Sequence, residues 1–356
     1  MRRVGLIALL FTIAGCDVFL DDFAVKYLIG QLDAHANHVA NISFSPDGSR
    51  LASSDGRGFI VLWDMEKKDV IKEIVLSDPD YMIKDYHWPV LEFVSDLLVV
   101  QYFGQYTEGA FVPPELGAIK FYSADDGRQI NVAGLPTGVS FDKMTVLNGE
   151  LVVGERGPTT DPSYALSFYQ ISSGQVSKTD EWPVDGMVNF LAGASDGSRL
   201  AASIQDRQGV EVLDEFLKVF KADDGAELFS RSLPTGQDGQ AIRMLALSAD
   251  GVRLAYCPFP SGRVVVWEVD EERKDVVSEG GTEGEPCFLT FSPDGKWLAV
   301  NTFKTHMYRG NDMTPSVSIP IDHFWSGSIA FSFDSRTMAV GVSEKIRLWN
   351  VTHMKQ

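Results

Sequence analysis

Short runs of alternating apolar and polar residues recur along most of the chain, and turn-forming residues separate them. The clearest copies are Phe44-Ser-Pro-Asp-Gly48 followed by Ser-Arg-Leu-Ala-Ser, and Phe291-Ser-Pro-Asp-Gly295 followed by Lys-Trp-Leu-Ala-Val. Alternation with a period of two is typical of half-buried β-strands, and Asp-Gly between two such runs favours a hairpin. The pattern therefore predicts an all-β protein built from antiparallel hairpins.

The hairpin signal repeats at intervals that indicate stacked structural units. The turn residue falls at positions 47, 96, 148, 196, 250, 294 and 334, which are 49, 52, 48, 54, 44 and 40 residues apart. A period of about 40 to 50 residues is typical of repeat folds, in which each unit buries its faces against its neighbours. Seven markers predict seven units.

A second marker, an alternating run that ends in an aromatic residue, runs in phase with the first. It occurs in six units, as Ile60-Val-Leu-Trp63, Ile119-Lys-Phe-Tyr122, Leu166-Ser-Phe-Tyr169, Leu217-Lys-Val-Phe220, Val264-Val-Val-Trp267 and Ile346-Arg-Leu-Trp349. We find no copy in the sixth unit. Four strands per unit, named a to d in order, predict a seven-bladed β-propeller of four-stranded antiparallel blades.

These repeats resemble the WD-repeat family over about residues 25–352. Ala34-His35 stands where the family has Gly-His, and Trp63-Asp64 supplies the Trp-Asp dipeptide. The resemblance implies that a buried His, Ser or Thr, Asp and Trp bond one another inside a blade. His35, Ser53 and Trp63 match three of these positions, but Arg57 occupies the Asp position, with Asp55 two residues earlier. We therefore expect this structural network to be incomplete or rearranged.

The chain ends with a strand-like segment, residues 345–351, that has no outer strand after it. Residues 24–31 alternate as a strand does, and we expect them to pair with the last blade and close the ring. The alternative is that they form only a tether. The propeller domain is expected to span residues 24–356.

The N-terminus has the pattern of a bacterial secretion signal. Arg2 and Arg3 precede an apolar run that is too short to cross about 30 Å of hydrocarbon. The run ends in Ile13-Ala-Gly-Cys16, which resembles the bacterial lipobox and implies a diacylglycerol on the Cys16 sulfur. We expect residues 1–15 to be a signal peptide and residues 16–23 a lipidated tether. A plain cleavage site near an unmodified Cys16 is the alternative.

The lipobox resemblance implies a lipoprotein anchored at the periplasmic side of a bacterial membrane. Asp17 favours the inner membrane over the outer membrane under the enterobacterial sorting rule. The formal charge of −18 argues against nucleic acid as a partner, because phosphate contacts need Lys and Arg. We expect a monomer or one subunit of a hetero-complex.

One face of the propeller is predicted to carry enlarged loops. In this fold the d-to-a and b-to-c connections share a face, and the long b-to-c segments are residues 103–117, 155–164, 205–216 and 303–315. Rigidly held loops carry recognition, and exposed aromatic residues anchor partners. The predicted contacts with a protein or peptide partner are Trp88, Tyr106, Phe111, Pro113, Tyr164 and Trp325. The alternative is that the long loops have no role.

The histidines and hydroxyl residues do not form a recognisable catalytic or metal-binding pattern. His35, His38, His87 and His323 fall in loops of neighbouring blades, but no two have close ligand spacing on one element. No nucleophile elbow or Walker loop is present. We expect a non-enzymatic scaffold without cofactor or metal. The alternatives are a hydrolase- or lactonase-type propeller enzyme and a small-ligand-binding subunit, each using the central channel.

Two cysteines remain besides Cys16. Cys257 and Cys287 are predicted near strand ends that share a face of blades 5 and 6. An oxidising periplasm permits a bond if their Cα atoms lie within about 7 Å, but neighbouring blades often diverge more than this. We expect two separate buried thiols.

Overall fold

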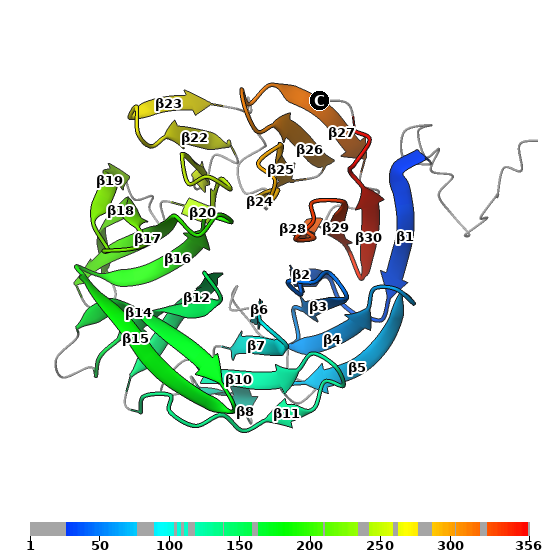
Figure 1. The fold of residues 1–356 in the computed structure, drawn as a ribbon, viewed down its shortest axis with the longest axis horizontal. Coiled ribbons are helices and arrows are strands. Elements are labelled where there is room, and N and C mark those ends of the chain that lie inside the picture. The colour runs from blue at the N-terminus through cyan, green and yellow to red at the C-terminus, as the bar shows by residue number, and fades with distance from the viewer. Residues whose placement is uncertain are drawn as a thin grey trace, which may run out of the picture.

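The computed structural model describes residues 26–76, 89–102, 105–107, 110–112, 118–137, 139–158, 163–208, 211–233, 242–258, 263–276, 287–302, 304–320 and 326–354. Within these ranges the strands form seven four-stranded antiparallel sheets that surround a central axis (Figure 1). The predicted all-β, seven-bladed propeller is therefore confirmed.

The strands of each blade run from the axis outward. Blades 1 to 3 consist of β2 (Val39–Phe44), β3 (Arg50–Asp55), β4 (Phe59–Asp64) and β5 (Asp69–Val75); β6 (Val90–Val94), β7 (Leu97–Tyr102), β10 (Ala118–Ser123) and β11 (Gln129–Ile130); and β12 (Ser140–Leu147), β13 (Glu150–Arg156), β14 (Tyr164–Ser172) and β15 (Gln175–Val184). Blades 4 and 5 consist of β16 (Met187–Gly193), β17 (Arg199–Gln208), β18 (Glu211–Lys221) and β19 (Glu227–Leu233); and β20 (Ile242–Leu247), β21 (Arg253–Pro258), β22 (Val265–Glu268) and β23 (Arg273–Val276). Blades 6 and 7 consist of β24 (Phe288–Phe291), β25 (Trp297–Asn301), β26 (Lys304–Arg309) and β27 (Pro315–Pro320); and β28 (Ser326–Phe331), β29 (Thr337–Val342), β30 (Lys345–Asn350) and β1 (Leu28–Asp33).

The aromatic marker occupies one structural position in all seven blades. Each aromatic residue of the third strand lies opposite a Leu or Met of the second strand. The pairs are Trp63 with Leu51, Tyr122 with Leu98, Tyr169 with Leu151, Phe220 with Leu200, Trp267 with Leu254, Tyr308 with Leu298 and Trp349 with Met338. This cross-strand pair is the repeated packing unit of the blades.

Two predictions about the sixth blade are wrong. The marker is present there as Thr305-His-Met-Tyr308, and residues 303–315 are not a loop, because they contain β26 and the turn that follows it. The alternation in β26 is real, since Thr305 and Met307 are buried, but polar Thr305 and His306 hide it in the sequence.

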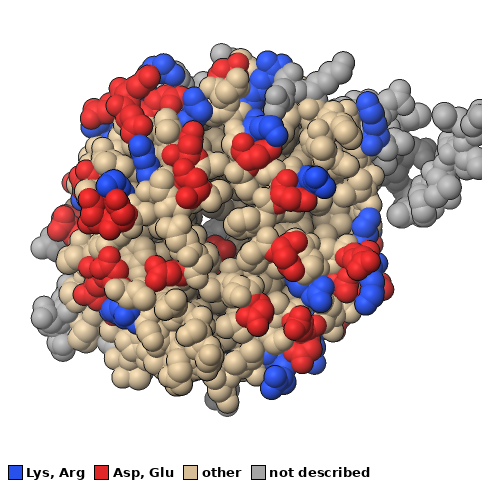
Figure 2. All heavy atoms as spheres, in the orientation of Figure 1, with Lys and Arg blue, Asp and Glu red and all other residues tan. Residues whose placement is uncertain are grey.

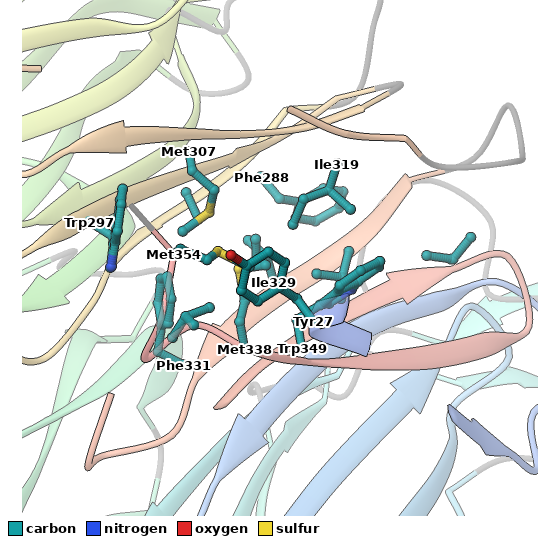
Figure 3. Close-up of a cluster of buried hydrophobic side chains, with 14 residues drawn as sticks. Tyr27, Phe288, Trp297, Met307, Ile319, Ile329, Phe331, Met338, Trp349 and Met354 are labelled. Carbon is teal, nitrogen blue, oxygen red and sulfur yellow. The ribbon is translucent and has the colours of Figure 1, made fainter. Parts of the chain in front are cut away.

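Packing between neighbouring blades forms the core. One cluster joins blades 6 and 7 and contains Tyr27, Met307, Met338 and Trp349 (Figure 3). Six further clusters of buried apolar side chains lie in the other parts of the ring that the structure describes. Because each blade buries its faces against its neighbours, the ring stabilises all its sheets together.

The first strand closes the ring, as predicted. β1 pairs antiparallel with β30, with Leu32 opposite Ile346 and Asp33 opposite Lys345. The strand ends at Asp33, two residues later than predicted, and residues 24 and 25 lie outside the described residues. β1 covers the edge that β30 would otherwise expose.

The two faces of the ring differ in their connections. We name the turn face after the first-to-second and third-to-fourth strand connections, such as residues 45–49 and 65–68. The loop face carries the second-to-third strand and blade-to-blade connections, and includes the hairpin β8 (Gln105–Thr107) and β9 (Ala110–Val112). The predicted loop at residues 205–216 is instead mostly strand, because β17 and β18 stay paired as far as Gln208 and Glu211.

Candidate functional site

The network that the WD resemblance implies is present inside blade 1. Ser53 Oγ accepts a hydrogen bond from Trp63 Nε1 at 2.8 Å and lies 2.7 Å from His35 Nε2. His35 Nδ1 lies 3.5 Å from Asp55 Oδ2, and all four side chains are buried. A proton on Nδ1, facing the carboxylate, leaves Nε2 to accept the Ser53 proton. The network fastens the connection before β2 to the blade interior.

Asp55 takes the place that the family pattern gives to residue 57. Its Oδ1 accepts the backbone N–H groups of Arg57 and Phe59 at 2.9 and 3.2 Å, so the side chain caps the turn between β3 and β4. Its Oδ2 is thereby turned toward His35. The network is therefore rearranged, and its His35–Asp55 link is a 3.5 Å contact without a hydrogen bond. Ser53 is buried and shared between two partners, which gives it a structural role.

Three of the six predicted partner-contact residues lie outside the described residues, and the other three lie on the loop face. Trp88, Pro113 and Trp325 lie outside the described residues. Tyr106 and Phe111 are opposite one another in the β8–β9 hairpin, which projects from the second-to-third strand connection of blade 2. Tyr164 begins β14 and is partly buried opposite Arg156. The structure therefore brings Tyr106 and Phe111 together, and places Tyr164 on the adjacent blade.

The described histidines near the loop face pack against protein. The His38 ring packs against Gly56. A Cβ added to Gly56 would lie 2.9 Å from His38 Cε1. Burial lowers the pKa of His38, although the nearby Asp55 carboxylate opposes this shift. His87 and His323 lie outside the described residues. Among the residues that are described, no three His, Cys, Asp or Glu side chains gather as metal ligands.

Two ionisable residues on the innermost strands were missed by the sequence analysis. Burial raises the pKa of Glu92, on β6, to about 8. On β12, burial lowers the pKa of Lys143 to about 8, against the effect of the Asp142 carboxylate, and its ammonium lies 5.6 Å from the Phe190 ring centroid. The signal was a charge within an otherwise apolar inner strand, as in Val90-Leu-Glu92-Phe-Val94. Both side chains are half-buried on the innermost strands of their blades.

A disulfide joins blades 5 and 6, so the prediction of separate thiols is wrong. Cys257, on β21, is bonded to Cys287, just before β24, with their Cα atoms 6.4 Å apart. The two strands approach because β24 is the innermost strand of its blade and packs beside β20 and β21. This separation is within the range that a disulfide can bridge.

The same position fastens other pairs of blades by hydrogen bonds. In blades 1, 2 and 6, the residue three positions after the Leu of the Leu–aromatic pair reaches the start of the next blade with its side chain. The bonds are Ser54 Oγ to Pro89 O at 3.3 Å, Gln101 Nε2 to Phe141 O at 2.8 Å, and Asn301 Nδ2 to Gly327 O at 2.7 Å. Cys257 is the covalent version of this contact.

The turn face has two depressions. A groove of about 330 Å³ lies between blades 7 and 1, with Ile29, Phe44, Met65 and Leu348 among its lining residues. A second, of about 200 Å³, is lined by the inner strands of blades 3 to 6, including Leu191, Leu245 and Phe291. Figure 2 shows acidic side chains gathered at the β22–β23 end of blade 5, and both signs of charge at the β4–β5 end of blade 1.

Comparison with known families matches residues 26–64 to the WD domain, G-beta repeat. The matched segment runs from before β1 to the end of β4 and contains the entire His35–Ser53–Trp63 network. No curated protein sequence matches the chain. Within the described ranges, no helix is long and apolar enough to span a bilayer. The match shows that the first blade is similar to a WD repeat, and the described residues form seven blades.

Proposed function

We propose that this protein is a non-catalytic scaffold that an acylated Cys16 tethers to the periplasmic side of a bacterial membrane, the inner membrane in preference to the outer. It binds a protein or peptide partner through its loop face. WD-repeat propellers generally act by binding proteins, and the unequal elaboration of the two faces is the observation that carries this assignment. The turn face repeats one short Ser-x-Asp turn, whereas the loop face adds the β8–β9 hairpin.

The Cys257–Cys287 bond supports export. Disulfides persist in oxidising compartments such as the bacterial periplasm and are rare in reducing cytosol. This agrees with the secretion signal and with the lipobox-like Ile13-Ala-Gly-Cys16.

The buried polar groups support a non-catalytic role. Ser203 and Glu215, in blade 4, resemble a nucleophile beside a base, but both are fully buried. Ser203 Oγ donates to Glu215, which also accepts from Asn189 Nδ2 at 3.1 Å and Gln205 Nε2 at 3.3 Å. A carboxylate satisfied in this way holds strands together and does not meet substrate.

Photo-crosslinking tests the loop face directly. A photoreactive amino acid at Tyr106 or Phe111 in the native lipoprotein is expected to capture a partner in membranes. The same group at Leu228, an exposed residue on outer strand β19, is the matched control and is expected to capture none. Capture at Leu228 alone would contradict the assignment.

The lipid anchor has its own test. Cys16→Ser is expected to move the protein from the membrane fraction to the soluble fraction, because the acyl chains supply about 0.8 kcal/mol per buried CH₂. A protein with Cys16→Ser that still sediments with membranes would remove the anchor from the proposal.

Glu92 and Lys143 favour a second candidate, a subunit that binds a small charged ligand in the central channel. Calorimetry with Glu92→Gln and Lys143→Met tests it. A ligand whose affinity falls at least tenfold in either variant would support the second candidate over the scaffold.

A further inference from the structure

The chain enters the propeller from the turn face. Leu28, the first residue of β1, lies opposite Trp349 near the end of β30, and the next turn brings Val351 N to Arg336 O at 2.9 Å. Tyr27 donates a hydrogen bond to His353 O at 3.3 Å. The entry point is therefore the outer strand of blade 7, on the side of the short turns.

The tether between the proposed anchor and this entry point is short. Ten residue steps separate Cys16 from Lys26, and a fully extended chain covers about 3.5 Å per residue, so the reach is at most about 35 Å. This is close to the thickness of a small domain. The tether therefore holds the chain just before β1 within about 35 Å of the proposed anchor.

The part of the turn face around β1 exposes apolar side chains. Phe333 is 58% exposed and Ile29 is 39% exposed. Phe333 occupies the turn position that holds Pro46 in blade 1, Ala249 in blade 5 and Pro293 in blade 6. Between Ile29 and this turn runs the 330 Å³ groove. Large exposed apolar groups of this kind mark contact surfaces.

The charge of the turn face also differs between the two sides of the ring. After the aligned Trp63 and Trp267, blade 1 has Glu66-Lys-Lys68 and blade 5 has Asp270-Glu-Glu272. Lys68 Nζ donates to Ile29 O across the blade junction, and the Lys67 side chain is 70% exposed. Lys67 Nζ also lies 3.5 Å from Asp64 Oδ2, and Asp47, Glu66 and Asp334 line the groove, so both signs of charge meet in this part of the turn face.

We propose that this tether sector (Ile29, Met65, Lys67 and Phe333) lies against the bilayer that holds the anchor, with Phe333 at the lipid headgroups. The inference rests on the proposed anchor at Cys16. Burial of Phe333 and Ile29 adds to acylation as a second membrane signal. The loop face then points away from the lipid, toward a partner in the periplasm.

Fluorescence quenching at three single-cysteine labels tests this orientation. Arg336→Cys lies in the tether sector, Glu344→Cys lies on the loop face of the same blade, and Glu271→Cys lies on the turn face of blade 5. The lipoprotein is reconstituted into vesicles of phosphatidylethanolamine and phosphatidylglycerol that carry headgroup spin labels. We expect at least twofold stronger quenching at position 336 than at 344 or 271. Equal quenching at all three sites, or the strongest at 344, would overturn the orientation.

A second variant distinguishes membrane contact by the tether sector from membrane binding through the acyl chains. Phe333→Asp is expected to reduce the quenching at position 336 toward that at 344, while the protein stays in the vesicle fraction through its acyl chains. Unchanged quenching would show that Phe333 has no part in the contact. Failure of the unmutated lipoprotein to associate with vesicles would instead overturn the anchor, and the orientation with it.

Discussion

Blades 1 and 5 have the same frame and different interiors. Both place a Trp opposite a Leu, Trp63 with Leu51 and Trp267 with Leu254. Both begin the second strand with an Arg that reaches a carbonyl of the next blade, Ala124 O from Arg50 and Gly310 O from Arg253. The shared features are those that form a blade and dock it on its neighbour.

The interiors solve the same packing problem in two ways. Blade 1 places Ser53 between Trp63 and His35. Blade 5 has Tyr256 in the place of Ser53, and among the described residues Trp267 Nε1 makes no hydrogen bond of good geometry. Burial raises the pKa of Tyr256, and the indole of Trp267, acting on the Tyr256 hydroxyl, opposes this rise. Blade 5 adds the Cys257 bond where blade 1 has only the Ser54 hydroxyl. Blade 1 is thus fastened to blade 2 by a hydroxyl, and blade 5 to blade 6 by a covalent bond at the equivalent position.

The largest difference in the free energy of unfolding is expected at the position that joins a blade to the next one, which is Ser54 in blade 1 and Cys257 in blade 5. Replacing Cys257 and Cys287 with Ala should lower the free energy of unfolding by about 3 kcal/mol, because the bond closes a loop of 30 residues. Ser54→Ala in blade 1, which removes one 3.3 Å hydrogen bond, should cost about 0.5 kcal/mol. Urea unfolding measures both. Equal losses would show that the disulfide adds nothing to the hydrogen bond it replaces.

Removing the Ser53 hydroxyl from blade 1 and the Tyr256 hydroxyl from blade 5 tests how much each contributes to the stability of its blade. Ser53→Ala is expected to cost about 2 kcal/mol, because it leaves Trp63 Nε1 and His35 buried without their shared partner. Tyr256→Phe should cost less than half as much, since Trp267 Nε1 makes no hydrogen bond of good geometry. Thermal unfolding followed by circular dichroism compares the two variants. A larger loss for Tyr256→Phe would contradict the comparison.

A smaller difference in the free energy of unfolding is expected from the two arginines that reach the next blade, Arg50 and Arg253. Arg253 donates to Glu268 Oε1 at 2.7 Å, Gly310 O at 2.7 Å and Asn311 O at 2.8 Å, whereas Arg50 reaches only Ala124 O in the next blade, at 3.1 Å. We expect Arg253→Ala to cost about 1.5 kcal/mol and Arg50→Ala about 0.5 kcal/mol in urea unfolding. Arg253→Lys should restore only part of the loss, because ammonium lacks the guanidinium fork. Full rescue by Lys would mean that charge alone acts there.

The smallest change in the free energy of unfolding is expected from the Ser-x-Asp turns that both blades share, at Asp47 and Asp250. Hydrogen bonds from Ser45 and Ser49 lower the pKa of Asp47 to about 2, and the pKa of Asp250 is lowered as well, by bonds from Ser248 and Val252 that outweigh burial. A lowered folded-state pKa stabilises the protein above the unfolded value near 4, and this contribution is lost as pH falls toward 2. Asp47→Asn should therefore cost less than about 1 kcal/mol at pH 7, because the group is exposed, and progressively less as the pH falls through 2. Denaturant midpoints across this range measure the difference. A constant difference at every pH would exclude the carboxylate as its source.

The repeat and the ring were predictable because they rest on local signals. The Asp-Gly turns and the aromatic marker set the number of blades, and the unpaired edge at residues 345–351 indicated the closing strand. β26 was missed, because His306 and Thr305 interrupt the apolar alternation on which the assignment depends. The twofold period survives in the packing, where Thr305 is as buried as Met307.

The site features that escaped prediction depend on contacts between distant segments. Asp55 completes the blade 1 network only because its other oxygen caps the turn at Arg57. The approach of Cys257 and Cys287 to 6.4 Å follows from how two blades converge, and sequence spacing carries no such distance. Glu92 has a charged side chain, and only its position on an innermost strand shows that it is partly buried.

The pairing of Leu28 with Trp349 affects the order in which the blades can fold. During synthesis or passage through a translocation channel, β1 emerges first and waits for β30, which comes last. Blade 7 cannot be completed on the nascent chain, and its unpaired edge stays open to other strands until the final residues arrive. Folding factors that shield this edge would act at the end of the chain's delivery, when the first strand and the last can meet.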